Sequence, residues 1–146
     1  METKETREER TVVEASPFDT LWSMATGYCL SRCLHTVAGL GVADALGETP
    51  LTAADLAESV GADADALGRI LRLLASHGVF EMRGGMFGHT DASRMLREDH
   101  PRSMRDRARM WGLPVFWETF GAMEHSARTG LPAMPTVFPE GLWART

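Results

Sequence analysis

The chain has 146 residues, of which 44% are hydrophobic and 24% charged, the composition of a folded domain rather than of a disordered chain. Its net charge of −5 provides no general attraction to nucleic acid or to an anionic membrane surface. Apolar stretches are interrupted well before the ~20 residues of a transmembrane helix, and the charged first residues lack the apolar centre of a secretion signal. We therefore expect one ordinary domain, located in the cytoplasm, with no membrane partner.

The N-terminal part is expected to be a charged arm followed by a long helix. Residues 1–14 are densely charged and are predicted to be disordered. Residues 16–19 combine a serine, a proline and an aspartate at the spacing of a capping box, so a helix should begin there. It should extend to about Ala38, with Gly39 and Gly41 ending it.

The apolar residues of this helix cover about half of its circumference, wider than the ~100° stripe of a helix that is buried on one side. One side of the stripe can pack on the rest of the domain, and the apolar side chains on the other side need a second surface to cover them. Another subunit could supply that surface, which predicts a dimer. The predicted interface residues are Phe18, Leu21, Trp22, Ala25, Tyr28 and Cys29.

Cys29 and Cys33 are the only cysteines. On a helix their Cβ atoms would be ~5–6 Å apart, too far for the ~3.8 Å of a disulfide. Two thiols are also too few for a four-ligand zinc site. Both are interpreted as small buried residues, with a contact between subunits as the alternative.

Three short helices are predicted next. The first, residues 41–47, is bounded by glycines. The second begins at Thr52, which has capping-box spacing, and ends at Gly61. The third begins at Asp63 and ends before Gly78, with its apolar residues at i, i+3, i+4 and i+7: Leu67, Ile70, Leu71 and Leu74.

A β-hairpin should follow, because segments 79–83 and 86–90 flank Gly84-Gly85. In this register Met82 faces Phe87, and Phe80 faces His89, giving one apolar face that can cover the third helix. Three helices and a hairpin in this order are typical of a winged helix. The predicted fold class is therefore mainly α, with a winged-helix-like dimerisation domain at residues 15–100.

The C-terminal part is predicted to be a kinked connecting helix, residues 101–130, followed by a linker, residues 131–146. After a short polar helix at 91–99, a new helix should begin at Ser103 by its capping spacing. Pro114 should kink it, because proline lacks the amide donor. The second half should run from Val115 to Arg128.

A winged helix suggests DNA binding, which is the alternative function. The helix that would enter the major groove begins with Asp63 and Asp65, whose carboxylates would repel phosphates. Arginines cluster outside that helix, where carboxylates in the same stretch dilute them: Arg94, Arg97, Arg102, Arg105, Arg107 and Arg109. A solvated ion-pair network is the simpler interpretation, and nucleic acid is not the expected partner.

No catalytic, cofactor-binding or metal-ligating residue is predicted, because the five histidines are scattered and none forms a pair at metal-ligand spacing. His125 is a candidate pocket residue. Aromatic and methionine side chains cluster around Pro114 and could form a substrate pocket, with core or dimer interface as the other interpretation. They are Met110, Trp111, Phe116, Trp117, Phe120 and Met123.

The order of these elements resembles the N-terminal region of bacterial and plant small-molecule O-methyltransferases. The resemblance covers roughly residues 16–135. It rests on stretches 40–46 (LGVADAL), 51–57 (LTAADLA), 67–75 (LGRILRLLA), 78–80 (GVF), 116–117 (FW) and 125–130 (HSARTG).

The resemblance implies an intertwined homodimer whose N-terminal module closes over a small aromatic or polyketide-like substrate. In the family a domain that binds the methyl donor, S-adenosylmethionine, follows this module. That domain is not expected within this sequence, and the 131–146 linker would lead toward it. We therefore do not expect methyl transfer by this chain alone.

Overall fold

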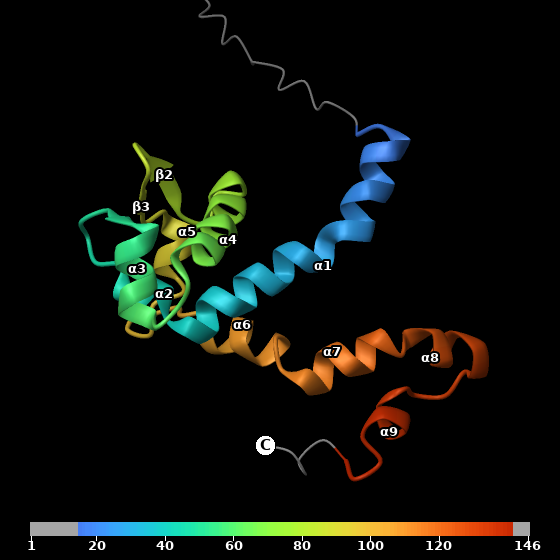
Figure 1. The fold of residues 1–146 in the computed structure, drawn as a ribbon. Helices are drawn as coiled ribbons and strands as arrows, with labels where there is room; N and C mark the ends of the chain where they lie inside the picture. Colours follow the sequence, from blue (N-terminus) through green and yellow to red (C-terminus); the bar gives the residue numbers. More distant parts are fainter. Residues whose placement is uncertain (1–14, 142–146) are drawn as a thin grey trace, which may run out of the picture.

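The computed structural model describes residues 15–141 and is mainly helical (Figure 1). The predicted arm at residues 1–14 lies outside the described residues, as does the end of the predicted linker at 142–146. Among the described residues, no helix is long and apolar enough to cross a membrane. The helices are α1 (Pro17–Leu40), α2 (Val42–Ala45), α3 (Ala53–Val60), α4 (Ala64–Ser76), α5 (Asp91–Arg94), α6 (Arg105–Trp111), α7 (Pro114–Gly121), α8 (Met123–Thr129) and α9 (Met134–Val137). The strands are β1 (Leu51–Thr52), β2 (Glu81–Arg83) and β3 (Met86–Gly88).

Helix α1 begins where its capping signal predicts. Ser16 Oγ accepts a hydrogen bond from the Asp19 backbone N–H at 3.1 Å. The helix ends at Leu40, two residues beyond the predicted Ala38, because Gly41 rather than Gly39 adopts the left-handed conformation, with φ 72°.

The two following helices also begin and end at the predicted signals. Thr52 and Asp55 form a reciprocal capping box at the start of α3, and Gly61 ends that helix with φ 69°. Asp63 accepts a hydrogen bond from Ala66 N–H at 2.8 Å at the start of α4. Helices α3 and α4 pack against each other.

The predicted hairpin is present, with Met82 opposite Phe87 and Gly84-Gly85 at the turn. A third strand, β1, pairs with β3 to give the order β1-β3-β2, which the sequence did not predict because two residues carry no periodicity. The expected apolar face is incomplete, since Met82 remains 47% exposed whereas Phe87 is buried. The mainly helical fold is confirmed, and the winged-helix assignment stays a prediction.

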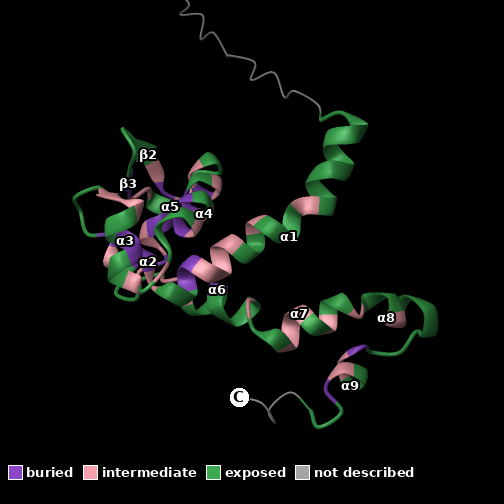
Figure 2. Cartoon of the chain, in the orientation of Figure 1, coloured by how far each residue is buried: buried purple, intermediate pink, exposed green. Residues whose placement is uncertain are grey.

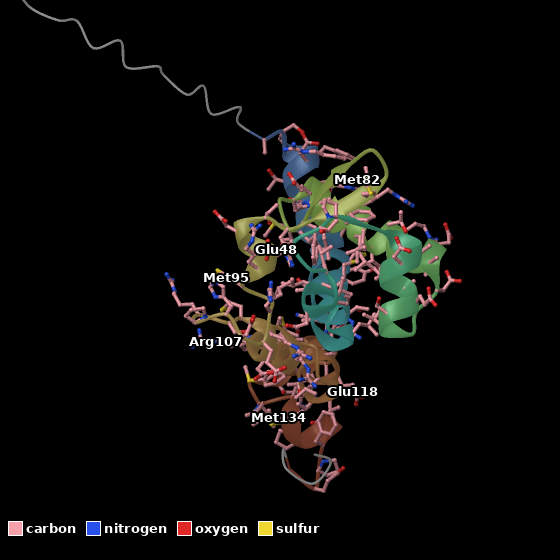
Figure 3. The ribbon with its side chains drawn as sticks, turned by 90° about the vertical axis from the view of Figure 1, so that its left-hand side faces the viewer. Glu48, Met82, Met95, Arg107, Glu118 and Met134 are labelled. Atoms are coloured by element: carbon pink, nitrogen blue, oxygen red, sulfur yellow. The ribbon has the colours of Figure 1, made fainter. Side chains whose placement is uncertain are left out.

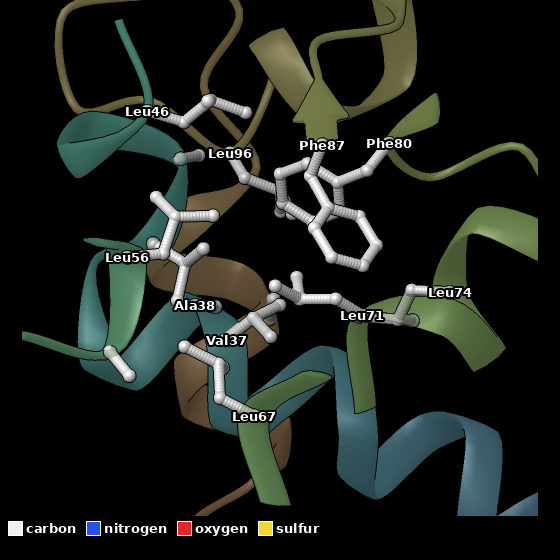
Figure 4. Packing of buried hydrophobic residues seen from close by; sticks show 14 residues of the cluster. Val37, Ala38, Leu46, Leu56, Leu67, Leu71, Leu74, Phe80, Phe87 and Leu96 are labelled. Atoms are coloured by element: carbon white, nitrogen blue, oxygen red, sulfur yellow. The ribbon is translucent and has the colours of Figure 1, made fainter. Parts of the chain in front are cut away.

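One hydrophobic core joins α1–α4, the sheet and the segment after α5 (Figures 2 and 4). Phe80 adopts φ 74°, a conformation that costs a bulky residue on the order of 1–3 kcal/mol. Its ring is 1% exposed, and burial of such a ring contributes ~1.5–3 kcal/mol, enough to offset the strain. The largest buried side chains include Leu46, Leu56, Leu67, Leu71, Leu74, Phe80 and Phe87.

Two helical arms extend from this core. The N-terminal half of α1 projects away from it, and α7 and α8 continue outward beyond α6 (Figures 1 and 2). In α1 only Val37 and Ala38, near its C-terminal end, are buried, and α7 and α8 contain no buried residue. The N-terminal half of α1 and helices α7 and α8 therefore contribute no buried residue to the core.

The connecting region differs in detail from the prediction. The break before Pro114 is confirmed, but the preceding helix begins at Arg105 rather than Ser103. Ser103 Oγ donates to the carbonyl oxygen of Arg97 at 2.7 Å and accepts from the Arg105 backbone N–H at 3.3 Å. The expected continuous second half is interrupted at Ala122 between α7 and α8.

The segment after Gly130, predicted to be a linker without periodicity, contains a short helix. Helix α9 packs against α7, and the flanking Ala133 and Phe138 are buried. Two apolar contacts around a single turn are too few to produce a periodic pattern.

The core predicts a large stability effect at Leu71, which is 0% exposed in the centre of α4. The Leu71→Ala substitution should lower the free energy of unfolding by about 2–5 kcal/mol, because it removes buried methyl groups and leaves a cavity. Urea unfolding at a fixed protein concentration measures this. Met82→Ala on the exposed side of the hairpin is the control and should change the value by less than ~0.5 kcal/mol. Equal effects of the two substitutions would contradict the placement of the core.

Candidate functional site

The second arm, helices α7 and α8, is attached to α1 by polar and aromatic contacts. We call these contacts, which involve Arg32, His35, Gly112 and Trp117, the joint. Arg32 Nη1 donates a hydrogen bond to the carbonyl oxygen of Gly112 at 3.0 Å, and its guanidinium lies 4.9 Å from the ring centroid of Trp117. The imidazole of His35 meets the same indole edge-on, with 5.9 Å between centroids. Arg32 and His35, one turn apart on α1, therefore hold the start of α7 from two directions.

Gly112 allows the two helices to approach this closely. A Cβ atom at position 112 would lie 2.8 Å from His35 Cβ and 3.1 Å from its Cγ. Neither atom is the flexible end of a side chain, so only glycine fits without a shift of α1 or α6. The role of Gly112 is not predictable from the sequence, because a lone glycine between two helical segments has no turn motif around it.

A pocket of about 460 Å³ opens between α1 and the α6–α7 segment. Tyr28, Ser31, Leu34 and His35 line it from α1, and Trp111, Phe116, Trp117 and Phe120 from the other side. This brings together four of the six predicted pocket residues. Met110 instead borders a different hollow beside Arg32 and Arg109, and Met123 lies on α8, 56% exposed. His125 does not line the pocket, and its Nε2 is 3.4 Å from Thr136 Oγ1.

Two polar atoms at this joint are buried without a hydrogen-bond partner among the described residues: His35 Nδ1 and Trp117 Nε1. Burial and, secondarily, the charge of Arg32 lower the pKa of His35 below its ordinary value, so the imidazole is neutral at pH 7. The pocket wall thus offers mainly aromatic and apolar faces, while His35 Nδ1 and Trp117 Nε1 are buried behind it.

The predicted dimer-interface residues lie together on the free half of α1. Phe18, Leu21, Trp22 and Tyr28 are each more than 60% exposed, and Ala25 and Cys29 are also exposed. The rings of Phe18 and Trp22 stack at 5.9 Å between centroids. These side chains form one continuous apolar stripe that nothing in residues 15–141 covers.

The expectation that both cysteines are buried is wrong. Cys29 is exposed and Cys33 half-buried, because the domain covers α1 only toward its C-terminal end. Both thiols are free. Partial burial, and secondly the neighbouring Cys29, raise the pKa of Cys33, so its thiol is protonated at neutral pH. Within the described part of the chain no group of three or more His, Cys, Asp or Glu side chains could hold a metal ion.

Comparison with known proteins identifies the family. The O-methyltransferase dimerisation domain family matches residues 22–99. The chain is 38% identical over 119 residues to phenazine O-methyltransferase PhzM of Lysobacter antibioticus, covering 81% of this chain and 35% of that protein. It is 33% identical over 138 residues to mitomycin biosynthesis 6-O-methyltransferase of Streptomyces lavendulae, covering 93% of this chain and 40% of that protein.

A solved structure with a similar fold is that of CalO1, a methyltransferase in calicheamicin biosynthesis, in its SAH-bound form. The TM-score is 0.76 at 34% identity, over 86% of this chain and 39% of that one. The chain therefore belongs to the O-methyltransferase dimerisation domain family, as its sequence motifs predicted. It spans about two fifths or less of the length of these relatives.

The Gly112→Ala substitution tests the joint. The added Cβ would overlap with His35 and should lower the free energy of unfolding by about 1–3 kcal/mol. Gly121→Ala is the matched control, since nothing lies within 4 Å of a Cβ there, and it should be neutral or stabilising by up to ~1 kcal/mol. Denaturant unfolding of the two variants measures the difference. If Gly112→Ala were as well tolerated as Gly121→Ala, α1 and the Gly112 turn would not be in close contact.

His35 should make stability depend on pH. Folding favours its neutral form, so the unfolded chain takes up a proton more readily as the pH falls below the ordinary histidine value of ~6.5. The contribution of neutral His35 to the free energy of unfolding is therefore fully present above that pH and decreases below it. The fall in thermal midpoint between pH 7.5 and 5.5 should be smaller in His35→Gln than in the wild type, whereas His77→Gln, an exposed substitution, serves as the control. If the thermal midpoints of His35→Gln and the wild type fell in parallel with pH, His35 would not be the source of the pH dependence.

Proposed function

We propose that this chain is the dimerisation and substrate-lid module of an S-adenosylmethionine-dependent O-methyltransferase that acts on a hydroxyl of a small aromatic or polyketide-like molecule. The observation that carries the proposal is the apolar stripe on α1 beside an aromatic pocket, in a chain of the dimerisation domain family. The named relatives methylate phenazine and mitomycin compounds by their printed names, which supports an aromatic substrate.

The proposed partner is a second copy of the chain. A monomer would leave Phe18, Leu21, Trp22 and Tyr28 in water as one patch, which single-chain proteins rarely tolerate. Burial of each such side chain contributes ~1.5–3 kcal/mol, and a two-fold contact counts every residue twice. Between α1 and α4, a further hollow of about 450 Å³ is bordered by Trp22, Cys29 and Leu73, so the proposed interface surface is not flat.

The proposed activity requires a cofactor, but we assign no cofactor-binding role to the described residues. S-adenosylmethionine would supply the methyl group, and CalO1 was solved with SAH bound. Nucleoside cofactors of this kind need a glycine-rich turn between a strand and a helix. Here Gly84-Gly85 joins two antiparallel strands, so the residues in 15–141 do not fit the cofactor. We assign none of them to it.

The alternative function, DNA binding, receives no specific support from the geometry. Asp63 caps α4, and Asp65 at the same end is paired with Arg69 at 3.3 Å. Both carboxylates are therefore present at the helix end that would have to approach phosphates. Four of the six clustered arginines are paired with carboxylates, which supports the ion-pair interpretation: Arg94, Arg97, Arg105 and Arg109.

Sedimentation equilibrium tests the proposed dimer. The wild-type chain should give twice the 16.0 kDa chain mass at micromolar concentration. The Leu21→Asp/Trp22→Asp double variant should sediment as a monomer, because a buried charge without a partner is strongly unfavourable.

Thr20→Asp is the matched control, since it adds a charge on the other side of the same helix and should leave the dimer intact. Far-UV circular dichroism of both variants separates loss of association from loss of folding. A wild-type chain that remains monomeric at high concentration would overturn the dimerisation role.

A further inference from the structure

Arg107 differs from its neighbours on α6 in having no counter-ion. Arg105 is paired with Asp44 at 3.3 Å and with Glu98 at 3.2 Å, and Arg109 is paired with Asp106 at 3.5 Å. Arg107 is exposed, and no carboxylate in residues 15–141 lies within ion-pair distance of it. Figure 3 shows it at the edge of the molecule, on the α6 segment.

This arginine borders the aromatic pocket. The pocket lining contains no aspartate or glutamate, and apart from Arg107 it consists of aromatic, aliphatic and neutral polar side chains. A guanidinium at the edge of such a pocket is attracted to an anion more strongly than one in open water, because the apolar walls screen the charge less. It also presents paired N–H groups that match the two oxygens of a carboxylate.

The size and chemistry of the pocket suit one kind of ligand. Its volume of about 460 Å³ lies in the usual range for small-molecule sites, ~300–1,000 Å³. Trp111, Phe116 and Phe120 provide flat apolar surfaces for a fused aromatic ring. Tyr28 and Trp117 also line the pocket, so aromatic side chains lie on both the α1 and the α7 side.

We propose that this pocket binds an aromatic ring bearing a carboxylate, with the ring between the α1 and α7 walls and the carboxylate on Arg107. The proposal rests on the proposed function, in which the pocket receives a small aromatic substrate, and it narrows the substrate class to aromatic acids. A second copy of the chain filling the same pocket is the competing outcome.

The test compares two probes of equal ring size, 2-naphthoate and 2-naphthol, with the ¹⁵N-labelled 146-residue chain at pH 7. The indole N–H resonances of the four tryptophans report binding, and two of these residues line the pocket. Naphthoate should bind about tenfold more tightly than naphthol. Arg107→Gln should remove that preference by weakening naphthoate alone, and Arg107→Lys, which keeps the charge, should retain part of it.

Arg102→Gln is the matched control, because Arg102 also has no carboxylate partner within residues 15–141 but does not line the pocket. It should leave both affinities unchanged. Equal binding of the two probes, with no effect of Arg107→Gln, would overturn the assignment of the carboxylate and leave the aromatic pocket standing. If neither probe binds to a chain that sediments as a dimer, both the carboxylate assignment and the assignment of the pocket to an aromatic ligand would be overturned. The pocket would then be assigned to the second copy of the chain.

Discussion

Helix α1 projects well beyond the domain on which it packs (Figure 1). Its 24 residues extend over ~36 Å, yet its buried residues are only Val37 and Ala38, near its C-terminal end. The turns before Leu30 carry a broad apolar stripe into solvent, whereas Leu30, Cys33 and Leu34 pack against the core. A free helical segment shorter than ~12–15 residues is marginal in water, because most helical stability in proteins comes from packing of the apolar face. The uncovered half of α1 is the constraint from which the proposed dimer follows.

The same helix also determines where the second arm begins. Arg32 and His35 hold Trp117 and the Gly112 carbonyl, and the missing side chain at Gly112 lets α6 approach α1 closely. Pro114 then starts a new helix in a new direction. The pocket between α1 and α7 is a consequence of this joint, so pocket shape and dimer surface depend on one element. A change in the contacts that cover α1 would therefore alter the shape of the pocket.

Local signals in the sequence predicted the elements well. Ser16, Thr52 and Asp63 start helices because their side chains accept bonds from backbone N–H groups three residues on, and Gly84-Gly85 makes the hairpin turn because glycine readily adopts positive φ. Where the prediction failed, distant contacts decide the structure. Strand β1 exists because β3 lies beside it, and Ser103 Oγ bonds both to the Arg97 carbonyl and to the Arg105 N–H, while α6 begins only at Arg105.

The candidate site was only partly predictable. The aromatic cluster around Pro114 was visible in the sequence, and the structure brings Trp111, Phe116, Trp117 and Phe120 into one wall. The opposite wall was not visible, because Ser31, Leu34 and His35 lie about 80 residues away along the chain. The exposure of Cys29 was misjudged for a related reason, since helix periodicity gives the face of a residue but not how far the covering domain reaches.

Hydrogen–deuterium exchange at several protein concentrations tests the central claim, that the free half of α1 is covered by a second copy. Backbone amides of residues 20–29 should exchange quickly in dilute solution and become protected as the concentration rises through the dimer transition. Amides of the core helix α4 should stay protected throughout. Exchange in residues 20–29 that is equally fast at every concentration would contradict the account, because this half of α1 would then have no partner in a second chain.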